Sequence, residues 1–171
     1  MRLNLVISSL NAGGAERVMS TLANAWAERG HEVELFTTHD SGREPHYQIS
    51  TRVRRHSVDP RRRGRLQQPA VVRALRKAIR ASNPDAVISF LNYTNIMTLI
   101  ACRGLSCPVI VSERLDPRII DIGPIWSLLR RLTYRSAACL VAQTPTAAAL
   151  FEHLVPGRVQ VIPNPVLMPT C

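Results

Sequence analysis

Long apolar runs are missing from this 171-residue sequence. A helix needs ~20 consecutive apolar residues to cross a bilayer, and no stretch of the chain approaches that length. We therefore expect any association with a membrane to be peripheral. The apolar start resembles a signal peptide, but Asn4 and two serines interrupt it and Asn11-Ala12-Gly13-Gly14 follows directly. A first β-strand is the better interpretation.

Cysteine and histidine are too few and too scattered to build a metal or disulfide site. The cysteines show no C-x-x-C pairing, and no histidine stands near them at metal-ligand spacing. We expect no metal, and reduced thiols of the kind found in cytosolic proteins. The sequence also has no G-x-G-x-x-G fingerprint for a dinucleotide and no nucleophile-elbow motif for a serine hydrolase. The four cysteines are Cys102, Cys107, Cys139 and Cys171.

Acidic residues are almost absent from one stretch of the chain. The formal charge is +10, and residues 52–80 hold ten arginines and Lys77 against one acid, Asp59. The remaining eleven bases are balanced by eleven acids. The excess charge therefore predicts a local electrostatic surface rather than a generally basic protein.

Strand and helix patterns alternate along the whole chain. Leu3–Ile7 is a short apolar run, and residues 15–26 carry apolar side chains at helical spacing up to Gly30, which is typical of a helix C-cap. Thr144 before Pro145 has the sequence of a helix N-cap. This alternation predicts an α/β, Rossmann-like domain with a mainly parallel sheet and helices on both faces. Further strands are expected at 32–36, within 47–58, and at 86–90, 109–111, 139–142 and 159–162, and further helices at 69–79, 93–102, 124–135 and 144–154.

Paired glycines fill the loop between the first strand and the first helix. Gly13 and Gly14 let the backbone approach a ligand closely. The free amides at the start of the helix, near Ala15, favour an anion such as a diphosphate. An ordinary tight turn is the equally open alternative from these residues alone.

Polar side chains follow the strand at 86–90 and open the next helix. Asn92, Thr94 and Asn95 therefore lie where ligands bind in open α/β sheets, beyond the carboxyl ends of the strands. We expect them to line an acceptor-binding cleft. Simple capping of the helix by Asn92 or Thr94 is the alternative.

Four short motifs occur together in a characteristic order. Each is weak alone, but as an ordered set they resemble family-four glycosyltransferases of the B fold, over essentially all 171 residues. The motifs are Gly13-Gly14-Ala15-Glu16-Arg17-Val18, Arg29-Gly30-His31-Glu32-Val33, Asn83-Pro84-Asp85 and Val161-Ile162-Pro163-Asn164-Pro165-Val166.

The resemblance assigns a place to several segments. Residues 1–163 would form the N-terminal, acceptor-binding domain, and 164–171 would begin the hinge to a C-terminal donor-binding domain that this sequence does not contain. Gly13, Gly14 and Ala15 would lie at the interdomain cleft, near the donor's phosphates and the transferred sugar.

The segment Ser112–Arg118 follows another strand end. A similar S-E-R-x-x-P run occurs in relatives that act on lipid-diphosphate-linked glycans, so the resemblance implies a catalytic or acceptor role for Glu113 and Arg114. A surface ion pair is the alternative, above all for Asp116 and Arg118. Many family members carry a histidine hereabouts, and this sequence does not.

The arginine-rich stretch has a membrane interpretation and a nucleic-acid interpretation. Near anionic headgroups each base contributes about 1 kcal/mol before screening. A nucleic-acid surface would use aromatic stacking, and residues 52–80 contain no Phe, Trp or Tyr. We favour the membrane, with a solvated helix face as the plain alternative. The membrane-binding candidates are Arg61, Arg62, Arg63, Arg65, Arg73, Arg76, Lys77 and Arg80.

A second membrane candidate is the apolar run Ile119–Trp126, which is followed by leucines and arginines suited to an interfacial helix. For the leucines, Leu128, Leu129 and Leu132, we expect packing against the core instead.

By resemblance, the full-length protein is expected to be a retaining glycosyltransferase. It would move a sugar from a nucleotide diphosphate sugar, its co-substrate, to a lipid-linked saccharide in polysaccharide or glycolipid biosynthesis. It would act at the cytoplasmic face of the membrane without a cofactor, and the isolated half would be inactive. Two alternatives stay open: a stand-alone membrane- or acceptor-binding subunit of a split glycosyltransferase, and an arginine-rich nucleic-acid-binding domain.

Overall fold

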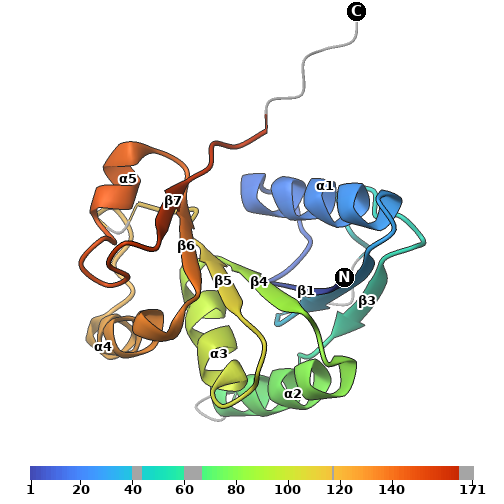
Figure 1. The fold of residues 1–171 in the computed structure, drawn as a ribbon, viewed down its shortest axis with the longest axis horizontal. Helices are drawn as coiled ribbons and strands as arrows, with labels where there is room; N and C mark the ends of the chain where they lie inside the picture. Colours follow the sequence, from blue (N-terminus) through green and yellow to red (C-terminus); the bar gives the residue numbers. More distant parts are fainter. Residues whose placement is uncertain (40–43, 60–66, 117, 166–171) are drawn as a thin grey trace, which may run out of the picture.

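Seven parallel strands form one sheet at the centre of the molecule (Figure 1). The structure is a computed structural model that describes residues 1–39, 44–59, 67–116 and 118–165. Across the sheet the strands stand in the order β3 (Arg54–Ser57), β2 (Glu32–Thr37), β1 (Arg2–Ile7), β4 (Ala86–Phe90), β5 (Val109–Ser112), β6 (Cys139–Ala142) and β7 (Val159–Val161).

The chain enters the sheet near its middle. It builds outward from β1 to β2 and β3, returns to pair β4 with the other side of β1, and then adds β5, β6 and β7 in turn. Every neighbouring pair is parallel. The predicted α/β class with a parallel sheet is therefore confirmed.

Helices cover both faces of the sheet, as predicted (Figure 1). Among the described helices, only α1 (Gly14–Glu28) packs on the first face, against apolar side chains of β1, β2 and β4. The second face carries the remaining helices. These are α2 (Gln67–Ser82), α3 (Asn92–Cys102), α4 (Pro124–Thr133) and α5 (Pro145–Ala149), with the short 3₁₀ turn η1 (Tyr134–Ser136) directly after α4.

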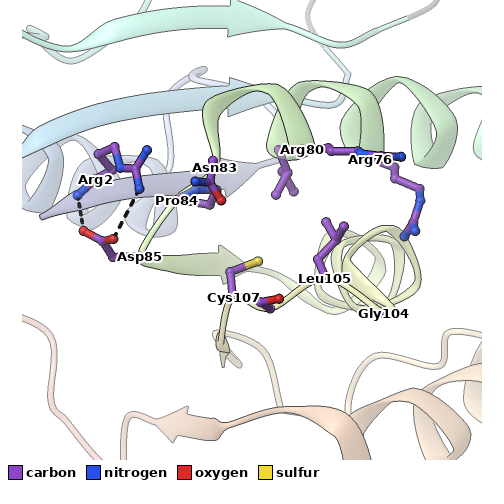
Figure 2. A pocket seen from close by; sticks show the side chains of 11 residues that line it. Arg2, Arg76, Arg80, Asn83, Pro84, Asp85, Gly104, Leu105 and Cys107 are labelled. Carbon is purple, nitrogen blue, oxygen red and sulfur yellow. Dashed lines mark hydrogen bonds and ion pairs between the residues drawn. The ribbon is translucent and has the colours of Figure 1, made fainter.

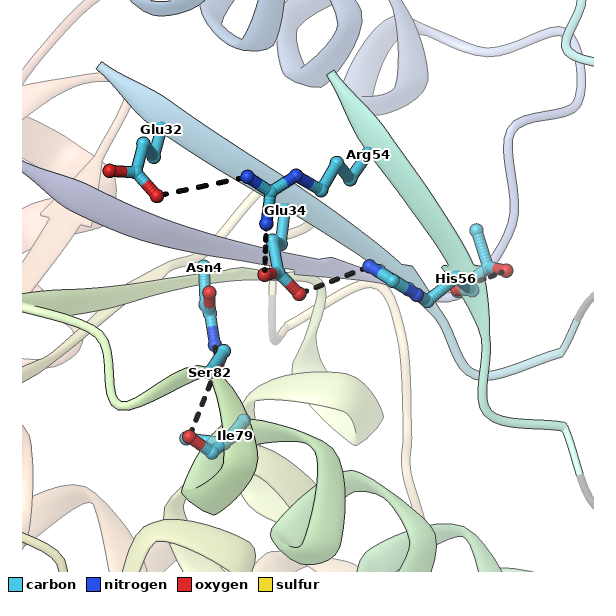
Figure 3. Close-up of polar contacts among 8 residues, drawn as sticks. Asn4, Glu32, Glu34, Arg54, His56, Ile79 and Ser82 are labelled. Carbon is cyan, nitrogen blue, oxygen red and sulfur yellow. Dashed lines mark hydrogen bonds and ion pairs between the residues drawn. The ribbon is translucent and has the colours of Figure 1, made fainter. Parts of the chain in front are cut away.

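The alternation of side chains along each strand divides the core into two clusters. In β1, Leu5 packs in the cluster under α1, and its neighbour Val6 packs in the larger cluster under α2 and α3. The buried Asn4 lies on the same face as Val6 and donates a hydrogen bond to the Ser82 hydroxyl at 2.6 Å (Figure 3). A polar side chain in the central strand is therefore paired rather than left unsatisfied.

Ion pairs hold the exposed edge strand β3. Arg54 lies 3.8 Å from the Glu32 carboxylate and 3.5 Å from that of Glu34, and His56 Nε2 lies 3.0 Å from Glu34 (Figure 3). Exposed pairs of this kind stabilise a fold only slightly. They do show that part of the arginine-rich stretch faces acids within the domain rather than an outside partner.

The end of α5 differs from the sequence prediction. The helix stops at Ala149 instead of continuing to Leu154. Beyond it the backbone makes tighter bonds, from Phe151 N to Ala148 O at 2.9 Å and from Leu154 N to Phe151 O at 2.9 Å. This turn places Phe151 and Val155 in the core, where they are 1% and 0% exposed. Core packing therefore overrides the helical pattern at this point.

Candidate functional site

The carboxyl ends of the strands gather the loops that carry the predicted site residues. All seven strands are parallel, so these loops meet at one edge of the sheet. The chain leaves β1 toward β2 on one side and resumes with β4 on the other side. In open α/β sheets, ligands bind in the crevice at such a switch point.

A cavity of about 500 Å³ lies at this switch point. Ser8 and His39 line it from the loops after β1 and β2, and Asn92 lines it from the start of α3. Tyr93 of α3 and Trp126 of α4 add an aromatic wall, with ring centroids 4.9 Å apart and ring planes at 85°. Apolar and aromatic walls with a few polar groups are the usual composition of a small-molecule site. We call this space the switch-point cavity.

A strained residue lines this cavity. Leu91, between β4 and α3, has φ 76°, a conformation that residues with a side chain rarely adopt. Two backbone bonds hold it there: Leu91 N donates to Ser112 O at 3.2 Å, and Leu91 O accepts from Asn95 N at 2.8 Å. Strain maintained in this way concentrates at binding sites.

The three predicted acceptor-binding residues separate into two groups. Asn92 and Thr94 line the switch-point cavity, and Asn95 does not. Asn92 Oδ1 also accepts the Tyr93 backbone N–H at 2.7 Å. The N-cap position of α3 is Leu91, with no side-chain cap bond, so the capping alternative for Asn92 and Thr94 is wrong. Asn95 is fully buried and donates to a β5 carbonyl at 3.1 Å and to the Tyr134 hydroxyl at 3.4 Å. Asn95 is therefore placed to hold the structure together.

Glu113 turns away from the cavity and into the core. It is 4% exposed and accepts a short hydrogen bond from the Tyr134 hydroxyl of η1. Burial raises the pKa of Glu113 above its ordinary value, although the Tyr134 hydrogen bond and the charge of Arg130 oppose that shift. Burial and the nearby carboxyl group also raise the pKa of Tyr134. This geometry joins the end of β5 to η1 and suits a positioning role better than direct chemistry.

Arg114 connects three loops at the carboxyl edge. Its guanidinium lies 4.1 Å from the ring centroid of Phe90, at the end of β4. It donates a short hydrogen bond to Asn164 Oδ1, which also accepts from Gln143 Nε2 at 3.3 Å. Burial lowers the pKa of Arg114 to about 10, so the side chain stays cationic at neutral pH. Arg114 therefore ties the β5 loop to the Pro-Asn-Pro segment after β7.

The glycine loop lies at the same edge but outside the switch-point cavity. Gly13 is the N-cap of α1, and a side chain there would collide with the carboxylate of Glu16 in the first turn. An acid in the first turn is favoured by the helix dipole. Gly14 has open space around it, and Ala15 packs against the core. The contact with Glu16 is therefore a structural reason for a glycine at position 13. The phosphate-binding role of this loop stays a prediction.

Sequence reasoning missed several of these contacts. Gln143 follows β6 directly, so the rule that selected Asn92 at a strand end would also have selected it. Tyr134 carried no local signal, because its partner Glu113 lies 21 residues away in the chain. Trp126 belongs to the apolar run proposed above as a membrane candidate, and its place beside Tyr93 depends on how α3 and α4 pack.

Comparison with known proteins identifies the domain. Residues 13–165 match the glycosyl transferase 4-like domain. The chain belongs to this family. The resemblance predicted from the four motifs is therefore confirmed.

Relatives of this glycosyl transferase 4-like domain are about twice as long as the chain. The GalNAc-alpha-(1->4)-GalNAc-alpha-(1->3)-diNAcBac-PP-undecaprenol alpha-1,4-N-acetyl-D-galactosaminyltransferase of Campylobacter jejuni is 35% identical over 170 residues, covering 96% of this chain and 46% of that protein. Lipopolysaccharide outer core galactosyltransferase WaaB shares the fold with a TM-score of 0.78 at 13% identity, over 99% of this chain and 47% of that one. Anabaena Alr3699/HepE in complex with UDP-glucose does so with a TM-score of 0.67 at 16% identity, over 96% and 44%.

The predicted membrane-binding bases lie in different surroundings. Arg61, Arg62, Arg63 and Arg65 fall outside the described residues. On α2 of this glycosyl transferase 4-like domain, Arg73, Lys77 and Arg80 are exposed. Arg76 instead donates to the carbonyls of Ala101 and Arg103, both at 2.7 Å, and so caps the end of α3.

Arg76 and Arg80 also line a pocket of about 600 Å³ at the amino edge of the sheet (Figure 2). Arg2 lines it as well and is paired with Asp85, its backbone N–H donating to the carboxylate at 2.8 Å. The C-terminal ends of α2 and α3 meet there, and such ends carry partial negative charge. The arginines thus complement two helix ends, which favours a structural explanation of this pocket.

Helix α4 exposes apolar side chains to solvent. Ile125 is 72% exposed, Leu128 56% and Leu132 60%, whereas Leu129 and Trp126 pack against the core. The expectation that all three leucines pack inward is therefore wrong for Leu128 and Leu132. We call the stripe of Ile125, Leu128 and Leu132 the α4 apolar stripe. The helix contains two arginines and no acid.

Two absences hold within the described ranges. No three His, Cys, Asp or Glu side chains there lie together so as to hold a metal ion. Over the same part of the chain, no helix has the length and apolarity to cross a membrane.

Proposed function

We propose that this domain is the acceptor-binding half of a retaining glycosyltransferase that moves a sugar from a nucleotide diphosphate sugar to a lipid-linked saccharide. A donor-binding domain, on the same polypeptide or on a separate subunit, would complete the cleft. The Campylobacter jejuni relative supports the acceptor class, because its name specifies a saccharide carried on PP-undecaprenol. The UDP-glucose complex of the Anabaena protein supports the donor class. The product would enter polysaccharide or glycolipid biosynthesis.

The switch-point cavity is the observation that carries this proposal. It lies where open α/β sheets bind ligands, and it combines the Tyr93–Trp126 wall with the polar groups of Asn92 and Thr94. Flat apolar ring faces beside hydrogen-bonding groups suit a sugar, which has both apolar and hydroxyl-bearing surfaces. We assign the acceptor saccharide to this cavity.

The proposed chemistry needs alignment and charge stabilisation. By its family resemblance, we assign removal of the acceptor proton to the departing diphosphate itself, without a protein nucleophile. Arg114 keeps its charge at neutral pH, and its Nε has no partner within the described ranges. We assign to Arg114 the stabilisation of negative charge on the leaving diphosphate. Glu113 and Tyr134 would hold Arg114 in position.

A binding experiment on the 171-residue chain tests the acceptor assignment. The probe is the soluble disaccharide GalNAc-α-1,4-GalNAc, taken from the substrate named for the Campylobacter jejuni relative. Saturation-transfer NMR is expected to show contact between the sugar and the domain. Trp126→Ala should weaken binding by roughly tenfold, which corresponds to a loss of ~1.4 kcal/mol of contact.

Ile125→Asn is the matched control, because Ile125 lies beside Trp126 on α4 but does not line the cavity. It should bind the disaccharide as the wild type does. Asn92→Ala should also weaken binding, without removing an aromatic side chain from the core. Equal binding by all four proteins, or none by the wild type, would refute the acceptor assignment.

We propose further that the domain works at the cytoplasmic face of the membrane and docks through the α4 apolar stripe together with neighbouring arginines. Burying a large aliphatic side chain contributes roughly 1.5–3 kcal/mol. The exposed α4 residues therefore offer a stronger anchor than screened charges alone. Arg61, Arg62, Arg63 and Arg65 stay candidates for the electrostatic part.

Vesicle co-sedimentation separates the two contributions. Wild type is expected to bind phosphatidylglycerol vesicles and to bind phosphatidylcholine vesicles weakly. Ile125→Asn with Leu128→Asn should lower binding more than tenfold at any salt concentration, since apolar burial is not screened. Changing Arg61, Arg62, Arg63 and Arg65 to Ser should lower it mainly at low salt. Unchanged binding of both variants would rule out both surfaces.

A further inference from the structure

A groove larger than the switch-point cavity lies between α3 and α4, near the amino end of the sheet. Its volume is about 840 Å³, which is within the range of roughly 300–1,000 Å³ typical of ligand pockets. Its inner surface is mainly apolar, and two exposed arginines stand among its lining residues. The residues that matter here are Leu99, Leu105, Leu129, Leu132, Arg103 and Arg135.

The groove and the switch-point cavity lie at opposite ends of the same helix pair. Tyr93 and Trp126, in the first turns of α3 and α4, line the cavity, and Leu99 and Leu132, near the ends of these helices, line the groove. Trp126 and Leu132 are six residues apart, or about 9 Å along a helix that rises 1.5 Å per residue. A single extended molecule can therefore reach both.

We propose that this groove holds the isoprenoid chain of the lipid-linked acceptor. The inference rests on the proposed function and extends it. The reacting end of the saccharide occupies the switch-point cavity, and the saccharide extends along the seam between α3 and α4. The phosphate groups then lie beside Arg103 and Arg135, and the hydrocarbon chain packs against the leucines.

Charge supports this occupant over a protein segment of mixed charge. Among the described residues that line the groove, two are arginines and none is acidic. The basic groups stand beside apolar walls, which is the pattern expected for an amphiphile with an anionic head. A purely apolar partner would leave the arginines without a role, and a free phosphate would leave the leucines without one.

The α4 apolar stripe connects the groove to the proposed membrane surface. Leu132 belongs to both, and it is 60% exposed. A chain leaving the bilayer would therefore meet apolar side chains continuously from the stripe into the groove. Transferring the chain to a protein wall avoids exposing it to water while its saccharide is in the cavity.

Isothermal titration of the 171-residue chain with farnesyl diphosphate tests the proposal, because this probe combines a short isoprenoid chain with a diphosphate. Wild type should bind it at least tenfold more tightly than inorganic diphosphate and than dihexanoyl phosphatidylglycerol. Leu132→Asn should weaken binding at least tenfold. Ile162→Asn is the matched control, since Ile162 is a similarly exposed apolar residue (54% against 60% for Leu132) outside both the groove lining and the α4 apolar stripe, and it should bind normally.

Three results would overturn the assignment. They are the absence of farnesyl diphosphate binding, equal weakening by Leu132→Asn and Ile162→Asn, and equal affinity for dihexanoyl phosphatidylglycerol, which would indicate a general acyl-chain site. The result is separable from the proposed function. If the disaccharide binds at Trp126 and farnesyl diphosphate does not bind, only the groove assignment fails. If farnesyl diphosphate binds and the disaccharide does not, the acceptor cavity fails and the groove stands.

Discussion

Removing the Tyr134 hydroxyl provides the sharpest test of the buried Glu113 network. Tyr134 is 0% exposed, and its hydroxyl donates to Glu113 while accepting from Asn95 Nδ2. Tyr134→Phe keeps the ring and leaves a buried carboxyl oxygen without its donor. Loss of a buried partner costs roughly 1–3 kcal/mol. We expect the free energy of unfolding to fall by about 2 kcal/mol, which lowers Tm by about 4–8 °C for a domain of this size.

The pH dependence supplies a second readout of the same network. The folded chain holds the Glu113 proton more tightly than the unfolded chain, because burial raises the pKa above its ordinary value of 4.5. Unfolding therefore releases a proton above pH 4.5, and this group's contribution to stability falls as pH rises toward the folded pKa. Glu113→Gln removes the titration and keeps an oxygen for Tyr134. As the pH rises from 5 to 8, the wild type loses the stabilising contribution of Glu113 and the variant has none to lose. The free energy of unfolding of Glu113→Gln, relative to that of wild type, should therefore increase over this range above pH 4.5.

Urea unfolding of wild type, Tyr134→Phe and Glu113→Gln at several pH values measures both effects. Tyr93→Phe is the matched control, because the Tyr93 hydroxyl has no hydrogen-bond partner among the described residues and the side chain is 39% exposed. Its stability should stay within about 0.5 kcal/mol of wild type. A Tyr134→Phe protein as stable as Tyr93→Phe, or a Glu113→Gln protein with the wild-type pH dependence, would show that the buried network is not formed as described.

Three further substitutions test local features. Gly13→Ala should lower the free energy of unfolding by less than ~1 kcal/mol, because the Glu16 carboxylate that the new methyl group meets is the end of a flexible side chain. In a Glu16→Ala background, thermal unfolding should show no loss of stability from Gly13→Ala. Arg76→Ala should lower the free energy of unfolding by about 1–2 kcal/mol through the lost cap on α3, whereas the exposed Arg73→Ala should change it by less than ~0.5 kcal/mol in the same denaturant titration. Thr144→Ala should cost about 1 kcal/mol, since the hydroxyl accepts the Ala147 N–H at 3.1 Å, and a Thr144→Ser protein of unchanged stability would confirm that the cap is responsible.

Local patterns in the sequence were enough to predict most elements of the fold. Each strand except the third was located within a residue or two, because short apolar runs bounded by turn residues leave few alternatives. The Thr144 cap was predicted correctly, since capping depends on residues three positions apart. The motif set also identified the family. All of these signals operate over a few residues, or repeat along one element.

The sequence alone determined the alternation of elements, the parallel sheet and the edge at which the site residues gather. Only the tertiary structure decided which way individual side chains face. Leu128 and Leu129 are adjacent leucines of α4, yet one lies in solvent and the other packs on the core, because both sides of this helix are apolar and only its neighbours select the buried one. Glu113 and Arg114 are likewise adjacent, and in the segment directly after β5 the first side chain contacts Tyr134 and the second contacts Asn164. Contacts between residues 21 or 50 positions apart depend on packing that no local pattern encodes.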